Sequence, residues 1–194
     1  MISIYQVIEH EELSEELGHI DYVDVALVSL EFKDVKLDME GFGCLIPSSE
    51  NPAVLGITFD SCIFPDFSTK EYPSTRLSVM LGGQWFKEHF GDISSCNEDV
   101  IIEKSLAAVK QYLKISDTPS SLEVSLLKQC IPHYTVGHRY RVANFDRVIE
   151  DNNLKLTLVG AGYLGAGVAD CITKTIDATE PLHHKVNDAH FSVW

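Results

Sequence analysis

The sequence lacks the features of several common protein classes. It contains no apolar run of the ~18 to 20 residues that a membrane-spanning helix needs. Its first residues, MISIYQVIEHEELSEEL, are acidic, unlike a secretory signal or an Arg-rich transit peptide. We therefore expect either a cytosolic protein or a chain whose first residue is not its natural start.

Basic residues and paired cysteines are also scarce. The 15 Lys and Arg residues stand against 29 Asp and Glu, a formal net charge of -14, so we expect no nucleic-acid partner, because phosphate contacts need clustered positive charge. The five cysteines are odd in number and form no CxxC pair, which favours free thiols over a disulfide framework or a zinc knuckle. His133 and His138 have no Cys or carboxylate at ligand spacing, so we expect no metal site.

The residues that are present indicate an α+β fold. The chain has 194 residues, 45% of them hydrophobic, enough for a buried core. Apolar residues that alternate with polar ones, or short apolar runs, predict strands at 23–29, 41–47, 53–60, 77–81 and 122–126. Helical spacing and capping signals predict helices at 9–18, 97–114 and 140–151.

The segment LKLTLVGAGYLGAGVADCI (154–172) has the form of a dinucleotide-binding turn. It reads as a strand at 154–159, then Gly160, Gly162 and Gly165, then a helix to about residue 177. A nucleotide-binding βαβ unit also needs a second strand that carries an acidic residue about 20 residues on, and none follows here. Two interpretations stay open: a packing turn without a ligand, or a closing strand and helix that presents backbone amides to a cofactor held mainly elsewhere.

Four blocks of sequence resemble a known family. They are GFGCLIPSSENPAVLGITFDSCIFP (41–65), RLSVMLGGQW (76–85), KQCIPHYTVGH (128–138) and LTLVGAGYLGAGVADCI (156–172). Together they are similar to the C-terminal part of oxygen-dependent protoporphyrinogen oxidase of the animal mitochondrial type. The resemblance implies an α/β (α+β) chain with the C-terminal portion of the FAD-dependent amine-oxidase-like fold.

The resemblance also implies a division of the chain. Residues 1–137 would be the end of a substrate-binding domain with a mixed sheet, 138–178 the closing helix, strand and helix of an FAD-binding domain, and 179–194 a disordered tail. The front part of such an enzyme, with its own GxGxxG motif, would be missing. We therefore expect the chain alone to hold no FAD and to be inactive.

The activity implied is the oxidation of protoporphyrinogen IX to protoporphyrin IX with FAD as cofactor and dioxygen as acceptor. This is the penultimate step of haem biosynthesis. By family alone, we also expect a homodimer attached peripherally to the mitochondrial inner membrane. No segment of this chain indicates that location.

Individual roles follow from matching positions. The substrate-binding residues implied are Phe42, Gly43, Leu45, Met80 and Ile131. The cofactor-binding residues implied are Gly165, Ala166, Gly167 and Leu126. Leu164 and Gly167 differ from the Glu and Ala expected of the family, which puts details of the flavin contact in doubt. No residue is assigned as a catalytic base.

Two other functions compete with this interpretation. One is a non-catalytic interaction module that reuses the C-terminal part of the fold. The other is a different flavoenzyme of the amine-oxidase fold, such as a desaturase. The GFGxLIPSSE and CIPxYTxGH blocks argue against the second alternative.

Overall fold

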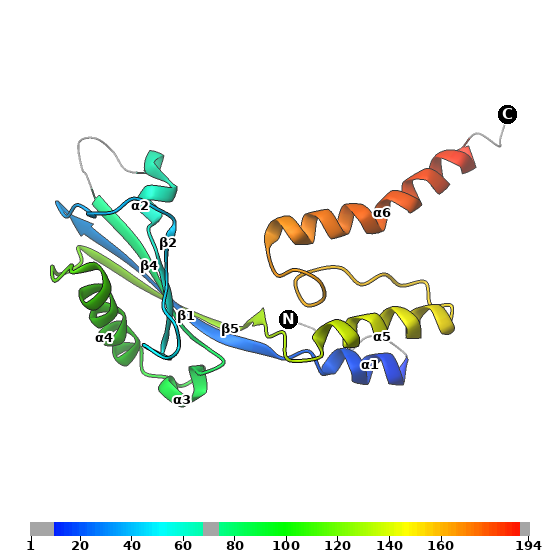
Figure 1. Ribbon diagram of the computed structural model, residues 1–194, viewed down its shortest axis with the longest axis horizontal. Coiled ribbons are helices and arrows are strands. Elements are labelled where there is room, and N and C mark those ends of the chain that lie inside the picture. Colours follow the sequence, from blue (N-terminus) through cyan, green and yellow to red (C-terminus); the bar gives the residue numbers. More distant parts are fainter. Residues whose placement is uncertain (1–9, 68–73, 191–194) are drawn as a thin grey trace. The chain divides into compact units, whose positions relative to one another are not determined.

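The chain forms two compact units, each described here by itself. The computed structural model describes residues 10–67 and 74–190, the side chains of 181–190 excepted. The helical unit comprises the chain up to Tyr22 and from Ile131 onward, and the sheet unit comprises Val23–Cys130. Figure 1 shows helices in the first unit and a sheet with attached helices in the second.

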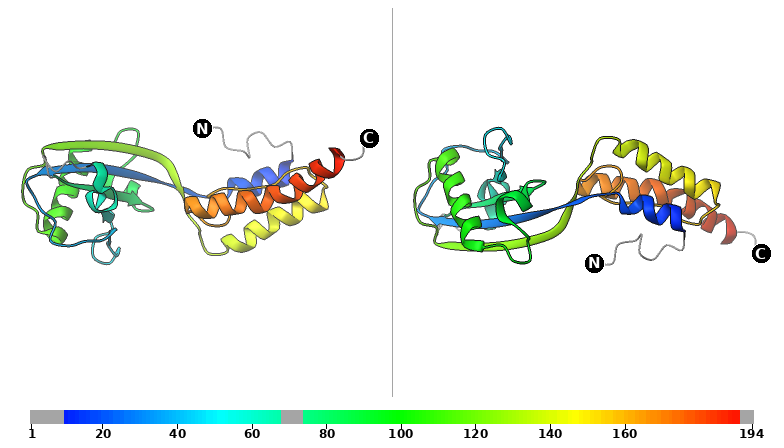
Figure 2. Two further views of the ribbon diagram at one scale, coloured as in Figure 1. Left: turned by 90° about the horizontal axis from the view of Figure 1, so that it is seen from above. Right: turned by 90° about the horizontal axis from the view of Figure 1, so that it is seen from below.

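The sheet unit is built on five strands in the order β2-β3-β4-β1-β5 within the described residues. The strands are β1 (Tyr22–Lys33), β2 (Gly43–Leu45), β3 (Val54–Thr58), β4 (Ser74–Gly83) and β5 (Ser121–Pro132). The pairs β1/β4, β2/β3 and β3/β4 are antiparallel, where the resemblance implied a mixed sheet. Both views in Figure 2 show β5 beside β1. All five strands predicted in this unit are confirmed, with ends that differ by up to several residues.

One face of the sheet is covered by α4 (Glu98–Ala108) and the π-helical segment Val109–Leu113 that continues it. The predicted helix at 97–114 is thus confirmed, and its N-cap is Asn97, whose Oδ1 accepts a hydrogen bond from the Asp99 amide at 2.9 Å. The core under α4 contains side chains that are at most 2% exposed. Among them are Ala26, Val28, Leu30, Leu77, Val79, Leu81 and Ile101.

Three short helices in the sheet unit were not expected from the sequence. They are α2 (Asp60–Ile63), the 3-10 helix η2 (Pro65–Phe67) and α3 (Phe86–Phe90). Each has five residues or fewer, which is too short to leave a helical period in the sequence.

The helical unit contains α1 (Glu11–Gly18), α5 (His138–Asp151) and α6 (Val168–His190). Leu13 and Leu17 of α1 pack with Phe145 and neighbouring apolar residues of α5 in a second core. The predicted strand at 154–159 is wrong. Those residues adopt no strand, although Leu154, Leu156 and Leu158 pack against this core. Alternating apolar residues indicate that one side of an extended segment is buried. A segment that pairs with no neighbouring strand shows the same alternation.

The last helix is longer than the sequence indicated. We expected a helix ending near 177 and a disordered tail from 179, but α6 continues to His190; residues 191–194 lie outside the described part of the chain. The helix passes through Pro181, although proline usually ends or kinks a helix. The assignment of the two units to a substrate domain and a flavin domain stays a prediction.

Candidate functional site

The glycine turn lies between the extended segment and α6. Residues 160–167 form turns and bends, and α6 begins at Val168, three residues after Gly165. Gly165 has a φ of +88°, a conformation that strains residues with a side chain. The strand-to-helix turn predicted from the sequence is therefore a turn that joins an unpaired extended segment to a helix.

Two glycines of this turn are covered by side chains. A Cβ on Gly162 would lie 2.5 Å from the hydroxyl oxygen of Tyr22. A Cβ on Gly165 would lie 2.5 Å from the Cβ and 2.7 Å from the Cγ of Asp170. Packing inside the chain thus already accounts for glycine at 162 and 165.

The other side of the turn is open. Ala166, Gly167 and Val168 are exposed. The Cys171 amide donates to the Gly167 carbonyl at 3.0 Å in the first turn of α6. The amides before Cys171 belong to the helix N-terminus, where the backbone N–H groups have no intrahelical acceptor. Ala166 and Gly167 are thus exposed and Gly165 is half-buried, and the role of all three in binding a cofactor stays a prediction.

Asp170 determines which cofactor group suits this terminus. Its Oδ2 would lie 2.9 Å from a Cβ on either Gly165 or Gly167, so the carboxylate stands beside the turn. A negative charge in the first helical turn satisfies the positive end of the helix dipole. It also repels a second anion. The terminus is consequently better suited to an uncharged hydrogen-bond acceptor, such as a ring carbonyl, than to a phosphate.

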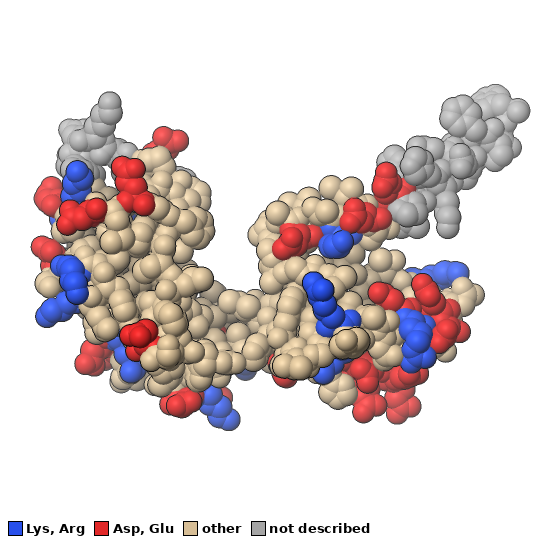
Figure 3. All heavy atoms as spheres, in the orientation of Figure 1, with Lys and Arg blue, Asp and Glu red and all other residues tan. Residues whose placement is uncertain are grey.

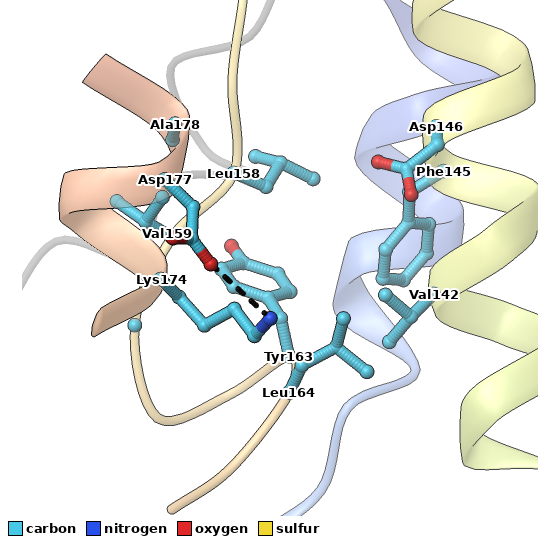
Figure 4. Close-up of a pocket in the computed structure, with 11 residues that line it drawn as sticks. Val142, Phe145, Asp146, Leu158, Val159, Tyr163, Leu164, Lys174, Asp177 and Ala178 are labelled. Carbon is cyan, nitrogen blue, oxygen red and sulfur yellow. Dashed lines mark hydrogen bonds and ion pairs between the residues drawn. The ribbon is translucent and has the colours of Figure 1, made fainter. Parts of the chain in front are cut away.

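A cleft of about 270 Å³ adjoins the turn within the helical unit. In Figure 4, side chains of α5 stand on one side, those of α6 on the other, and Tyr163 and Leu164 lie between them. Lys174 and Asp177 form an exposed ion pair of 3.5 Å at the α6 side. Burial raises the pKa of Tyr163 above its ordinary value, so its phenol stays neutral under physiological conditions.

Two of the predicted substrate residues, Leu45 and Met80, lie on the sheet face opposite α4. Register pairs Leu45 with Gly56, Gly56 with Met80, and Met80 with Leu27. Residues paired across neighbouring antiparallel strands have side chains on the same face. These four residues therefore form a row across four strands, which we call the apolar row. Leu45 is 84% exposed, and Leu27 and Met80 are half-buried.

The next row along the strands is polar. Gly43 pairs with Thr58, Thr58 with Ser78, and Ser78 with Ser29. Asp60 accepts hydrogen bonds from the hydroxyls of Thr58 at 2.7 Å and Ser78 at 2.5 Å. The face thus changes from apolar to polar within two residues. A flat molecule with an apolar body and polar substituents suits such a face.

The remaining predicted residues lie elsewhere. Phe42 is 73% exposed and stands just before β2. Ile131 belongs to the helical unit, so the structure does not group it with the other substrate residues. Leu126 belongs to the sheet unit, where it packs against the core, and its role beside the flavin stays a prediction. Leu27 and Gly56 of the apolar row were missed, because the sequence gives strand faces but not register.

Charge is distributed unevenly over the surface. Figure 3 shows acidic side chains gathered over α1 and the end of α5, where Glu11, Glu12 and Asp151 lie, while uncharged atoms dominate the middle of the sheet unit in this view.

The five cysteines are free, three of them half-buried and two exposed. Within the described residues, no group of His, Cys, Asp and Glu could hold a metal ion, and no helix is long and apolar enough to cross a membrane.

Comparison with known proteins identifies relatives. No protein-family model matches the chain. Human protoporphyrinogen oxidase is 38% identical over 160 residues, which is 82% of this chain and 33% of the relative. The chain is homologous to the protoporphyrinogen oxidases. The protoporphyrinogen oxidase of Schizosaccharomyces pombe is 35% identical over 85% of the chain and 34% of its own length. The chain thus spans about a third of the length of the curated relatives it matches.

More distant relatives and solved structures agree with the fold. Coproporphyrinogen III oxidase of Bacillus subtilis is 25% identical over 80% of the chain and 32% of the relative. The crystal structure of a candidate protoporphyrinogen oxidase from Exiguobacterium superposes with a TM-score of 0.67 at 20% identity, over 88% of this chain and 37% of that one. Reduced UDP-galactopyranose mutase gives 0.52 at 10% identity, over 79% and 31%. The expected amine-oxidase-like fold is therefore confirmed.

Proposed function

We propose that this chain takes part in the FAD-dependent oxidation of protoporphyrinogen IX to protoporphyrin IX, in haem biosynthesis, with dioxygen as the acceptor. The proposal rests above all on 38% identity to human protoporphyrinogen oxidase over 82% of the chain. The relatives named coproporphyrinogen III oxidase also act, by their names, on a porphyrinogen, which supports this substrate class.

The open side of the glycine turn is the part of the chain that fits a flavin. FAD, when bound, would supply the acceptor for hydride from the macrocycle. The exposed amides of Ala166, Gly167 and Val168 would donate to a carbonyl of the isoalloxazine ring. Asp170 would keep the pyrophosphate away from this terminus by repulsion. The proposed contact is therefore with the isoalloxazine ring alone. Residues other than 160–170 would bind the pyrophosphate.

The apolar row is the part that fits the substrate. Leu45, Met80 and Leu27 would contact one face of the macrocycle, and the Leu45 side chain covers Gly56, where a Cβ would lie 3.3 Å from the Leu45 Cδ2. Burial of the exposed Leu45 side chain would stabilise the complex by about 1.5 to 3 kcal/mol. Phe42, Gly43 and Ile131 stay proposed contacts that rest on the resemblance alone.

Location and assembly are proposed from the relatives alone. A tobacco relative that is 28% identical is named as mitochondrial. We propose the same compartment, peripheral attachment to the inner membrane, and a homodimer. The alternative of a non-catalytic interaction module stays open, because the 160 matched residues make up only 33% of the human relative.

A porphyrin titration tests the substrate part of the proposal. The purified chain is titrated with mesoporphyrin IX, followed by porphyrin absorbance, beside the variants Leu45→Asp and Met39→Asp. Met39 is the matched control, since it is an exposed apolar residue of the same unit, at 45%. We expect Leu45→Asp to weaken binding at least about tenfold and Met39→Asp to leave it unchanged. Equal affinity of the two variants would remove the apolar row from the proposal.

A further inference from the structure

Two side chains hold the main chain on either side of Gly162. The Tyr134 hydroxyl donates a hydrogen bond to the Ala161 carbonyl. His138 Nε2 lies 2.7 Å from the Tyr163 carbonyl, and because a carbonyl only accepts, Nε2 carries the proton and donates. Tyr134 and His138 come from the connection after β5 and the first residue of α5, more than twenty residues before the turn.

The two side chains also support each other. Their rings stack at 4.0 Å with an interplanar angle of 11°. Burial raises the pKa of Tyr134, so its hydroxyl keeps the proton that it donates. Between the two bonds, Gly162 is buried against the Tyr22 hydroxyl. The main chain at 161–163 is thus fixed at three consecutive residues.

His138 carries an unusual feature that packing alone does not explain. The residue is 5% exposed, and within the described part of the chain its Nδ1 has no hydrogen-bond partner. A buried polar atom without a partner destabilises a fold, and a leucine of similar size would avoid that penalty. What histidine offers at this position, and leucine does not, is the Nε2 donor aimed at the Tyr163 carbonyl.

We propose that Tyr134 and His138 are positioning residues that clamp the glycine turn in the shape that presents the amides of Ala166 and Gly167. A segment with glycines at 160, 162, 165 and 167 samples many backbone conformations when it is not held. Fixing it before binding lowers the entropy lost when a ligand binds. The identity of that ligand, the flavin ring, rests on the proposed function; the clamp itself does not.

Hydrogen exchange of the full 194-residue chain tests the clamp without any ligand. The readout is the exchange of peptides that cover 158–167, where the Tyr163 amide donates to the Gly160 carbonyl, compared with peptides of β4. The variants are Tyr134→Phe, His138→Leu and His138→Gln, whose side-chain amide can donate in place of Nε2. The matched control is Tyr140→Phe, because Tyr140 is 85% exposed.

We expect Tyr134→Phe and His138→Leu to exchange about three- to tenfold faster at the turn, the effect of one hydrogen bond, with β4 unchanged. His138→Gln should return exchange toward the wild-type rate. Tyr134→Phe removes one oxygen atom and leaves the ring in place, so it keeps the test valid if His138→Leu fails to fold. Turn exchange in Tyr134→Phe that equals the rate in Tyr140→Phe would overturn the clamp, and His138→Gln behaving as His138→Leu would overturn the role of Nε2.

Riboflavin binding by the same variants separates the clamp from the proposed function. If the wild-type chain binds riboflavin, we expect Tyr134→Phe and His138→Leu to bind it more weakly, by the same factor by which their hydrogen exchange at the turn is faster. If wild-type chain shows no binding while the exchange differences persist, the clamp stands and the proposed flavin contact fails.

Discussion

Replacement of Gly165 by alanine should destabilise the helical unit whether or not a cofactor is present. The φ of +88° costs a residue with a Cβ about 1 to 2 kcal/mol. The new Cβ would also lie 2.5 Å from the Cβ of Asp170, and relief of such an overlap costs about 1 to 3 kcal/mol. We therefore expect Gly165→Ala to lower the free energy of unfolding of this unit by about 2 to 5 kcal/mol.

A double-mutant cycle separates the two causes. Asp170→Gly removes all three side-chain atoms that would lie within 2.9 Å of the new methyl, whereas Asp170→Ala keeps the Cβ at 2.5 Å. Gly165→Ala should therefore be partly rescued by Asp170→Gly, with a coupling of about 1 to 3 kcal/mol, and hardly at all by Asp170→Ala. The φ cost should remain in both double variants.

Urea unfolding followed by far-ultraviolet circular dichroism measures these effects, with the helical unit fitted as its own transition. Exchange of β4 amides in the sheet unit serves as the internal reference. A Gly165→Ala chain within about 0.5 kcal/mol of wild type, a typical range for surface substitutions, would refute the reasoning. Glycine at 165 would then be required only by a ligand.

Two further predictions concern the sheet face and alkaline pH. Leu45→Ala should change stability by no more than about 0.5 kcal/mol, because Leu45 is 84% exposed, whereas Leu77→Ala in the core should cost about 2 to 5 kcal/mol; a large loss in Leu45→Ala, measured by urea unfolding, would make Leu45 a packing residue. Burial raises the pKa of Tyr22 and of Tyr163 above 10.0, so above that pH the unfolded chain loses phenolic protons that the folded chain retains, and stability should fall as pH rises through this range. Tyr163→Phe should flatten the fall in a thermal-unfolding series from pH 8 to about pH 11; an unchanged slope would contradict burial of its phenol.

The sequence predicted elements best where burial on one side produced a clear period. Leu77, Val79 and Leu81 alternate because β4 is covered on one face by α4, and the residues that located β5 pack against the same core. The prediction of a strand failed at 154–159, because Leu154, Leu156 and Leu158 alternate for the same reason without any strand partner among the described residues. Burial of one side of a segment produces a periodic pattern of apolar residues in the sequence, whereas backbone hydrogen bonding between strands does not.

The candidate site was predictable only in its short-range part. The glycine spacing located the turn, and the family blocks located Leu45 and Met80. Leu27 and Gly56 join Leu45 and Met80 through register, which is set by pairings between distant residues. Tyr22 is 140 residues from Gly162 in the chain, and no local pattern connects them. The effect of Asp170 on the choice of ligand follows from its position beside Gly165, which the sequence does not show.

The central claim is that the exposed amides at the start of α6 receive an uncharged flavin ring and not a phosphate. The most direct test is a nuclear magnetic resonance titration of ¹⁵N-labelled chain with riboflavin, and separately with pyrophosphate. We predict that riboflavin at high concentration shifts the amide signals of Ala166, Gly167 and Val168 through a ring contact that is too weak for the chain alone to hold FAD, and that pyrophosphate leaves them in place. Signals that ignore riboflavin, or that move with pyrophosphate instead, would contradict the account.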